Sequence, residues 1–313
     1  MKLSMSVIIP THDTQELTLR CLDSVARAEL EGLEVVVVDD GSVDQTVDRV
    51  RERFPNTKVV RLEPAGGFTV AANAGLREAS GELLFLLNSD AEIEADTLSL
   101  LSAAFAANPR LGAAGARLCF FDGRPQWSGG PEPSSFWILA LATGVTSLLE
   151  RLPGYRFFWP QGVESRRRVA WVSGAAMVIR RSAWLEVGML DERFGFYCQD
   201  LDYCLRLSDA GWEVAAIPSA RVFHHGGGTI RSRAGSVRAR YNPELLWTDL
   251  VRFFDKRHGE RRARSVARLL EGGGRVRVLA RRLRSLALSG PERERWDRDT
   301  AAFGRAIKGL AAW

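Results

Sequence analysis

Short, continuously apolar segments alternate with helical patterns along the first hundred residues, and this alternation constrains the fold more than any other feature. Residues 6–10 and 34–40 are β-branched apolar runs, and residues 82–87 form a third. Between the first two runs, apolar residues recur at helical spacing behind Thr14, a residue suited to cap a helix. Apolar runs of this length are typical of strands buried on both faces of a parallel sheet. The pattern predicts an α/β fold with a mostly parallel, doubly wound sheet.

Further elements are expected at similar spacing along the chain. The expected strands and helices cover residues 59–62, 69–79, 97–107, 171–181 and 199–210, followed by a strand that ends at 222–224. The helix over 97–107 should end before Asn108-Pro109, because the residue before a proline disfavours helix.

Polar residues follow three of the expected strands at their carboxyl ends. They are Thr11-His12-Asp13, Asp39-Asp40 and Asn88-Ser89-Asp90. Each cluster alone could be an ordinary loop, since Asp and Asn favour turns. Open parallel sheets bind ligands outside the carboxyl ends of their strands, so three clusters together predict a binding crevice there.

The common phosphate-binding motifs are missing from the sequence. Residues 10–15 read PTHDTQ, where a dinucleotide-binding fold needs G-x-G-x-x-G, and the chain contains no P-loop motif. Two glycine runs, 226–228 and 272–274, lack the preceding strand and following helix that phosphate binding requires. Nicotinamide-dependent and P-loop enzymes are therefore excluded.

The second half of the chain contains a second set of candidate site residues. Within 171–181, small side chains from Ser173 to Ala176 permit close approach of a ligand or another backbone. Asp200 and Asp202 would lie in the first turn of the next helix, where acidic residues also simply compensate the helix dipole. His224-His225 ends the last strand, as a structural pair or as metal ligands.

Positive charge is concentrated near the C-terminus. Residues 1–250 carry 26 Lys+Arg against 31 Asp+Glu, whereas residues 251–313 carry 17 against 7. Residues 251–290 combine a net charge of +9 with an apolar helical face, which predicts a basic amphipathic segment that docks on an anionic membrane surface. Residues 136–149 form a 14-residue apolar run, which suits either a membrane interface or a buried helix. The members of the expected helical face are Leu269, Val276, Leu279, Leu283 and Leu286.

Composition and cysteine content indicate a soluble globular protein in a reducing compartment. The 313 residues are 46% apolar and 26% charged, and the four cysteines show no zinc or disulfide spacing. No signal peptide is recognised, so a cytoplasmic protein is expected, peripheral on the inner face of the cell membrane through its basic segment.

Six separated motifs together resemble the inverting family 2 glycosyltransferases of the GT-A fold, with greatest similarity to the rhamnosyltransferase-like branch. They cover about residues 4–230 in the order seen in that family. The motifs are SVIIPTHD, VVVVDDGS, GGFTVAANAGLREASGELLFLLNSD, VSGAAMVIRRSAWLEVGMLDERF, QDLDYCLRLSDAGW and VFHHGGGT.

The resemblance implies a nucleotide-sugar-binding, Rossmann-like sheet with a basic helical C-terminal extension. The implied glycosyltransferase domain covers 1–240, with a nucleotide half of about 1–115 and an acceptor and catalytic half of about 116–240, and the extension covers 241–313. It implies that Asp200 is the general base and that Asp40 accepts a hydrogen bond from the uracil or thymine ring. The implied nucleotide-sugar ligands are Pro10, Thr11, Asp13, Asp40, Gly67, Asn73, Asn88, Ser89 and Asp90, and the implied acceptor and sugar contacts are Trp171, Gly174, Ala175 and Gln199.

A divalent metal is also implied, with two departures from the family pattern. Asp90 matches the last residue of the family's D-x-D, and His224 is the expected further ligand, with His225 as the alternative; oxygen ligands and one imidazole suit Mg²⁺ or Mn²⁺. Asn88 replaces the first carboxylate of the D-x-D, and Gln199 replaces the usual Glu before Asp200.

The expected reaction moves rhamnose or another hexose from a dTDP- or UDP-sugar to a hydroxyl of a polysaccharide or glycolipid acceptor, by single displacement with inversion. Two alternatives come from other classes. A sugar-phosphate nucleotidyltransferase would need a Gly-rich basic loop after the first strand, which residues 10–15 lack. A nucleic-acid-binding protein is suggested by the pI of 9.3, but the predicted crevice is acidic and no nucleic-acid partner is expected.

Overall fold

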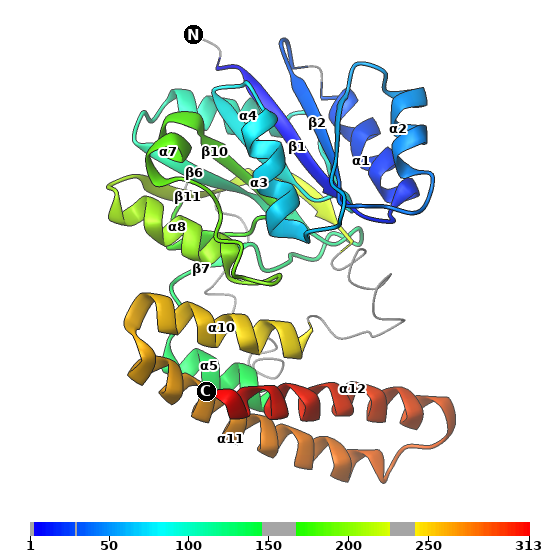
Figure 1. Ribbon diagram of the computed structural model, residues 1–313, viewed down its shortest axis with the longest axis vertical. Coiled ribbons are helices and arrows are strands. Elements are labelled where there is room, and N and C mark those ends of the chain that lie inside the picture. The colour runs from blue at the N-terminus through cyan, green and yellow to red at the C-terminus, as the bar shows by residue number, and fades with distance from the viewer. Residues whose placement is uncertain (1–2, 29, 146–166, 226–241) are drawn as a thin grey trace. The chain divides into compact units, whose positions relative to one another are not determined.

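The computed structural model describes residues 3–28, 30–145, 167–225 and 242–313. Contacts group the chain into two compact units (Figure 1). Unit 1 comprises Met1–Pro131, Trp159–Arg193 and Gln199–Arg233, and unit 2 comprises Glu132–Phe158, Phe194–Cys198 and Ala234–Trp313. The basic C-terminal segment therefore shares its unit with two stretches that the sequence assigned to the acceptor half.

Unit 1 is built on a mixed, nine-stranded sheet in the order β3-β2-β1-β4-β10-β6-β11-β5, with β8 paired to β11. The first four strands in this order run parallel, β6 is parallel to β11, and β10 is antiparallel to both β4 and β6. The strands are β1 (Met5–Thr11), β2 (Glu34–Asp39), β3 (Lys58–Arg61), β4 (Leu83–Leu87), β5 (Ala91–Ile93), β6 (Leu111–Cys119), β8 (Arg167–Arg168), β10 (Ala176–Arg180) and β11 (Glu213–His224).

Helices cover both faces of this sheet. Val7, Ile9 and Phe85 belong to a core that includes apolar residues of α1, α2 and α4. The alternate residues of β1 and β2 face α3, where a Cβ on Gly75 would lie 2.2 Å from Ile8 Cγ2, so only glycine permits this close packing. The helices of unit 1 are α1 (Gln15–Ala26), α2 (Thr46–Arg53), α3 (Phe68–Glu78), α4 (Thr97–Ala106), α7 (Arg181–Val187) and α8 (Gln199–Asp209). The α/β class and the doubly wound arrangement are confirmed.

The expected strand over 171–181 is wrong in one respect, because the chain turns in its middle. It forms β9 (Trp171–Val172), then a turn at residues 173–175, then β10. The Ala176 N–H donates to the Ser173 carbonyl at 3.2 Å, which closes the turn. β9 pairs with β7 (Gly129–Gly130) in a separate two-stranded sheet. Ser, Gly and Ala are compatible with a strand, so the local sequence does not mark this turn.

Unit 2 is a group of packed helices. It contains α5 (Ser135–Thr143), α10 (Pro243–His258), α11 (Glu260–Ser285), α12 (Gly290–Gly309) and a final 3₁₀ turn, Leu310–Ala312. Figure 1 shows α5, α10 and α12 beside α11, and all three pack against it. The helical character expected of the C-terminal segment is confirmed.

The glycine run 272–274 lies inside α11 and serves helix packing. A Cβ on Gly273 would lie 2.7 Å from Ala142 Cβ of α5, and one on Gly274 would lie 2.7 Å from Trp247 Cη2 of α10. The other run, 226–228, lies outside the described residues, as do residues 146–149 of the apolar segment. The described part of that segment is α5, which buries Ile138 and Leu141.

Within unit 2, α10 also holds the short stretch that precedes α8 in the sequence. The buried Asp249 carboxylate accepts hydrogen bonds from the N–H groups of Gly195, Phe196 and Tyr197 at 2.9–3.1 Å. These contacts show that α10 belongs to a packed unit, so deleting the C-terminal segment would remove core structure as well as surface charge.

All four cysteines are buried, as expected of core thiols. Burial raises the pKa of the Cys204 thiol to about 12, so this side chain stays protonated. No helix in the described part of the chain is both long and apolar enough to cross a bilayer.

Candidate functional site

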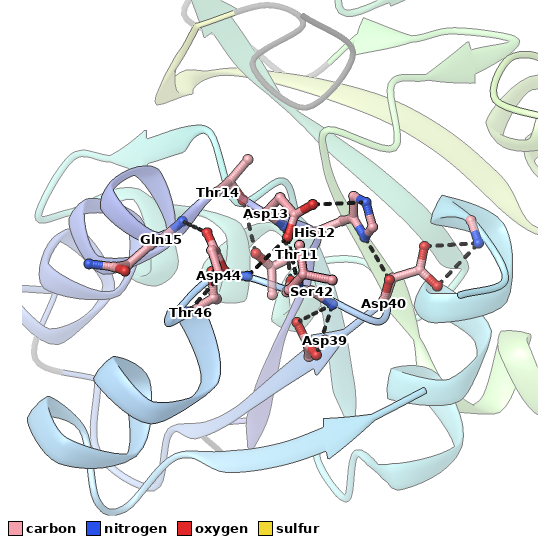
Figure 2. A network of polar contacts seen from close by, with 12 residues as sticks. Thr11, His12, Asp13, Thr14, Gln15, Asp39, Asp40, Ser42, Asp44 and Thr46 are labelled. Atoms are coloured by element: carbon pink, nitrogen blue, oxygen red, sulfur yellow. Dashed lines mark hydrogen bonds and ion pairs between the residues drawn. The ribbon is translucent and has the colours of Figure 1, made fainter. Parts of the chain in front are cut away.

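The loops after β1 and β2 are tied together by reciprocal hydrogen bonds (Figure 2). Asp13 Oδ1 accepts from the Val43 N–H at 2.8 Å, and the Asp13 N–H donates to Ser42 Oγ at 2.9 Å. Asp13 has a φ of 47°, a left-handed conformation that Asp tolerates better than most residues. The two polar clusters predicted from the sequence therefore form one hydrogen-bonded edge.

Asp40 connects this edge to the start of α3. Its buried carboxylate accepts the Gly66 N–H at 2.6 Å and the Gly67 N–H at 2.9 Å, and Figure 2 shows the side chain aimed at the beginning of that helix. His12 Nδ1 lies 2.7 Å from the Asp40 carbonyl, so this ring nitrogen is the donor. Both amides donate to the same carboxylate, which is therefore held in a fixed orientation at the start of α3.

A buried cluster of hydroxyl groups links β1 to the loop after β4. Thr11 Oγ1 lies 2.9 Å from Thr14 Oγ1 and 2.7 Å from Thr18 Oγ1, and Thr14 Oγ1 lies 3.1 Å from Ser89 Oγ. Thr11 and Ser89 were expected to contact the nucleotide-sugar. Within the protein, their hydroxyls hydrogen-bond to other hydroxyl groups next to the loop that carries Asp90, and the ligand contacts stay predictions.

The Asn88–Asp90 loop meets the end of β11. His224 Nε2 lies 3.1 Å from Asp90 Oδ1 and 3.2 Å from Asn88 Nδ2. The ring of His225 instead stacks on Phe121, with ring centroids 4.2 Å apart, and burial lowers the pKa of His225. The geometry thus brings Asn88, Asp90 and His224 together and leaves the His225 ring against an aromatic side chain.

Gln126 fixes the orientation of the His224 ring. Its Nε2 donates to the carbonyls of Cys119 and His224, so its Oε1 faces His224 Nδ1, at 2.9 Å. An amide oxygen only accepts, so Nδ1 carries the proton of the neutral ring. Nε2 is thereby directed at Asn88 Nδ2 and Asp90 Oδ1. Hydrogen bonding at one ring nitrogen is the usual means of preparing the other for a metal.

Among the described residues, no three His, Cys, Asp or Glu side chains form a metal-binding group. Asp90 and His224 are two side chains of these types, and Asn88 supplies an amide oxygen as a third candidate ligand atom. Asn88 Oδ1 is buried and has no hydrogen-bond partner within the described part of the chain. A buried amide oxygen, a carboxylate and an imidazole lone pair fit a hard divalent cation, which would satisfy the amide oxygen.

Asp200 opens α8 and is held by two backbone amides. Its Oδ2 accepts from the Gly174 N–H at 3.0 Å, and its Oδ1 accepts from the Leu201 N–H at 2.8 Å. Burial raises the pKa of Asp200, and these hydrogen bonds partly oppose the rise because they favour the carboxylate. A carboxylate in fixed orientation with a raised pKa has the properties of a general base.

Gln199 and Asp202, which flank Asp200 in the first turn of α8, have different hydrogen-bonding environments. Asp202 pairs with Arg206 at 2.9 Å, one turn along α8. Gln199 is buried, and its Oε1 has no hydrogen-bond partner among the described residues. Only Asp200, of the two acidic residues in this turn, contacts Gly174.

Two residues expected at the ligand site are buried in other environments. Asn73 lies on α3 with its amide bonded to the Leu190 backbone and to Glu192, so it fastens two protein segments. The Trp171 ring is buried and donates from Nε1 to the Pro131 carbonyl at 3.1 Å. These hydrogen bonds lie within the protein, and direct ligand contacts of the two residues stay predictions.

The remaining expected residues, Pro10, Gly67 and Ala175, lie near the site, and the observations on them concern the backbone. Pro10 is buried in β1, and Gly67 precedes α3 with a φ of 89°, which favours glycine. The Ala175 carbonyl accepts the Asn88 N–H at 3.0 Å. Gln126 was not predicted, and a single glutamine in a loop carries no sequence signal for this role.

The chain is similar to known protein families and to individual proteins. The family described as "Glycosyl transferase family 2" matches residues 6–186, and "Glycosyl transferase family group 2" matches residues 140–241. N-acetylglucosaminyl-diphospho-decaprenol L-rhamnosyltransferase of Mycobacterium tuberculosis is 31% identical over 240 residues, which cover 71% of this chain and 76% of that protein. The O-antigen biosynthesis protein RfbC of Myxococcus xanthus is 28% identical over 74% of this chain and 18% of its own length.

Among solved structures, the mannosyltransferase PcManGT from Pyrobaculum calidifontis, in complex with GDP-Man and Mn²⁺, has a TM-score of 0.59 and 19% identity. The match covers 100% of this chain and 88% of that one. At this identity the likeness concerns the fold, and it agrees with the expected GT-A architecture.

Proposed function

Because the chain belongs to glycosyl transferase family 2, we propose that it moves a sugar from a dTDP- or UDP-linked donor to a hydroxyl of a glycan or lipid-linked glycan, with inversion. Membership of this family and glycosyltransferase activity, both expected from the motifs, are confirmed by the family match and by the mycobacterial relative. Rhamnose is the proposed donor sugar, since that relative is a rhamnosyltransferase.

One observation carries the proposed mechanism. The turn at residues 173–175 contacts both chemically active regions: the Gly174 N–H donates to Asp200, and the Ala175 carbonyl accepts from Asn88. A single short turn thus holds the candidate base and the loop of Asp90 next to each other. A transferase needs this proximity, because the acceptor hydroxyl must meet the sugar carbon that is bonded to the diphosphate.

In the proposed reaction, Asp200 accepts the proton of the acceptor hydroxyl while that oxygen forms a bond to the anomeric carbon. The bond from this carbon to the diphosphate oxygen breaks, and the nucleoside diphosphate leaves with the electron pair. Attack and departure on opposite faces invert the anomeric centre, and no covalent enzyme intermediate forms. The carboxylate remains aimed through its bonds to Gly174 and Leu201.

Asp90, His224 and Asn88 are the proposed holders of a divalent cation, Mg²⁺ or Mn²⁺. Such a cation, when bound, supplies positive charge that stabilises the leaving diphosphate. Asp40, whose carboxylate is held by the Gly66 and Gly67 amides, is the proposed partner of the pyrimidine ring, and Asp13 lies on the same edge. Gln199 is the proposed acceptor contact, because its buried amide oxygen is unsatisfied within the described residues.

The proposed place of action is the cytoplasmic face of a membrane that carries the lipid-linked acceptor. Support comes from the mycobacterial relative, whose name specifies a diphospho-decaprenol-linked acceptor, and from the basic C-terminal helices. Unit 1 holds the proposed nucleotide and catalytic groups.

Thermal-shift measurements with nucleotide-sugars, with and without Mn²⁺, test the donor and the metal together. Binding to the folded state alone raises the melting temperature, so dTDP- or UDP-sugars should raise it more when Mn²⁺ is present. Asp90→Ala and His224→Ala should each remove the Mn²⁺-dependent part, whereas His225→Ala should keep it. Retention of the Mn²⁺ effect in His224→Ala, with its loss in His225→Ala, would contradict the assignment of the metal ligand.

A further inference from the structure

One side of α11 is apolar and exposed, although the helix is already packed through its other side. Val276, Leu279, Leu283 and Leu286 are 59%, 60%, 61% and 73% exposed. Their spacing of three, four and three residues places them on one side of an α-helix. The packed side carries Ala263, Val266, Ala267, Leu270, Gly273 and Gly274. We call the first four residues the α11 stripe. Single exposed leucines are ordinary, but a row of four on a helix of a folded unit indicates a binding surface.

A row of cationic side chains accompanies the stripe. Arg268, Arg275 and Arg282 are all exposed and recur every seven residues, which keeps them on the same side of the helix. The whole of α11 contains nine arginines and two glutamates, a net charge of +7. α12, by comparison, has five basic and four acidic residues, and none of the large exposed apolar side chains lies on it.

We propose that the α11 stripe and its arginine row form a docking surface for an anionic lipid bilayer. Apolar side chains can enter the boundary between headgroups and acyl chains while neighbouring guanidinium groups bind lipid phosphates. This pairing of an apolar row with positive charge matches an anionic membrane interface. This proposal rests on the proposed function, because a lipid-linked acceptor lies in a membrane. Vesicle binding is measured without any sugar, so membrane docking and sugar transfer can fail separately.

Charge argues against other occupants of the same surface. A second copy of the chain packed stripe to stripe would bring two arginine-rich helices together, and like charges at close range oppose that contact. One of the segments outside the described residues is also basic: residues 226–241 contain four arginines and no acidic residue. A nucleic acid would use the arginines but leave the four apolar side chains in water.

Co-sedimentation with lipid vesicles tests the surface directly. The full chain should bind vesicles of equal parts phosphatidylcholine and phosphatidylglycerol, bind pure phosphatidylcholine more weakly, and lose affinity as salt rises. The double variant Leu279→Gln and Leu283→Gln should bind the mixed vesicles about tenfold less tightly or worse, because two apolar side chains no longer leave water. Glutamine favours helix about as well as leucine, and both positions are exposed, so the melting temperature should stay the same.

Two further variants separate the contributions of the stripe and of the arginine row to vesicle binding. Leu185→Gln, which changes a 68% exposed leucine on α7 of unit 1, is the matched control and should bind like the unmodified chain. Arg268→Gln with Arg282→Gln should weaken binding to the anionic vesicles by about tenfold and reduce the salt effect. Equal losses in the Leu185 control would overturn the proposal. So would absence of vesicle binding, or a dimer in light scattering that the Leu279 and Leu283 changes convert to monomer.

Discussion

Gln126 Oε1 lies 2.9 Å from His224 Nδ1, and this contact determines which nitrogen of the imidazole faces Asp90. The amide cannot turn over without losing its bonds to the carbonyls of Cys119 and His224. The ring is therefore held with its Nε2 toward Asp90, in the orientation that a metal ligand requires.

Replacing Gln126 should weaken metal binding without removing a ligand. In Gln126→Ala the ring can rotate and change tautomer, so the affinity for Mn²⁺ should fall by about 10- to 100-fold, the usual effect of losing such a partner. The fraction of free Mn²⁺, followed by electron paramagnetic resonance, measures the affinity without any sugar substrate.

The control for this prediction keeps the acceptor and removes the amide donor. Gln126→Glu still offers an oxygen to Nδ1, so it should retain more Mn²⁺ affinity than Gln126→Ala. Equal losses in both variants, with matching falls in melting temperature, would show that Gln126 serves the fold and not the ring.

The sequence predicts the sheet well because each of its buried strands is a continuous run of apolar residues. Expected strands at 6–10 and 34–40 correspond to β1 and β2 with shifts of one residue at some ends. The helices over 97–107 and 199–210 are likewise found within one residue. Periodicity and proline placement act locally, so they can be read from the chain alone.

The features that complete the candidate site depend on contacts between distant residues. Gln126 and His224 are 98 positions apart, and the Gly174 amide bonds to Asp200, 26 positions on. The turn at residues 173–175 is specified by its partners, since its small residues would also suit a strand. The contacts of Asn73 are of the same kind, since its amide bonds to Leu190 and Glu192, more than 100 positions along the chain.

Removing the charge of Asp200 should abolish most transfer. Asp200→Asn should lower the turnover number by on the order of 10²- to 10⁴-fold, because the amide cannot take up the acceptor proton. Donor affinity, measured by calorimetry with a nucleotide-sugar, should stay near normal.

Asp202→Asn is the matched control, two residues along the same helix. Its carboxylate pairs with Arg206, so the change should cost stability more than turnover. Near-normal turnover in Asp200→Asn, or a larger loss in Asp202→Asn, would assign the base elsewhere.

The pH dependence of transfer should report the environment of Asp200. The base must be ionised to accept a proton, and burial raises its pKa above the ordinary value of 3.8. Transfer should therefore decline as the pH falls through this raised pKa, at a pH higher than an exposed aspartate would give. A profile of kcat against pH measures this limb, and a limb at or below the ordinary value would contradict the buried position of the base.

The glycines of α11 should have opposite effects on stability although they are neighbours in the sequence. A Cβ on Gly274 would lie 2.7 Å from Trp247 Cη2 and 2.9 Å from Trp247 Cζ3, and this tryptophan is fully buried. Gly274→Ala should therefore force α10 and α11 apart and lower the free energy of unfolding by about 1–3 kcal/mol. At Gly272 a Cβ meets nothing within 4 Å, so Gly272→Ala should raise the free energy of unfolding by up to about 1 kcal/mol, the helix propensity difference. Denaturant unfolding followed by tryptophan fluorescence compares the two variants. Stabilisation by both would show that the helices of unit 2 tolerate a wider spacing than this packing implies.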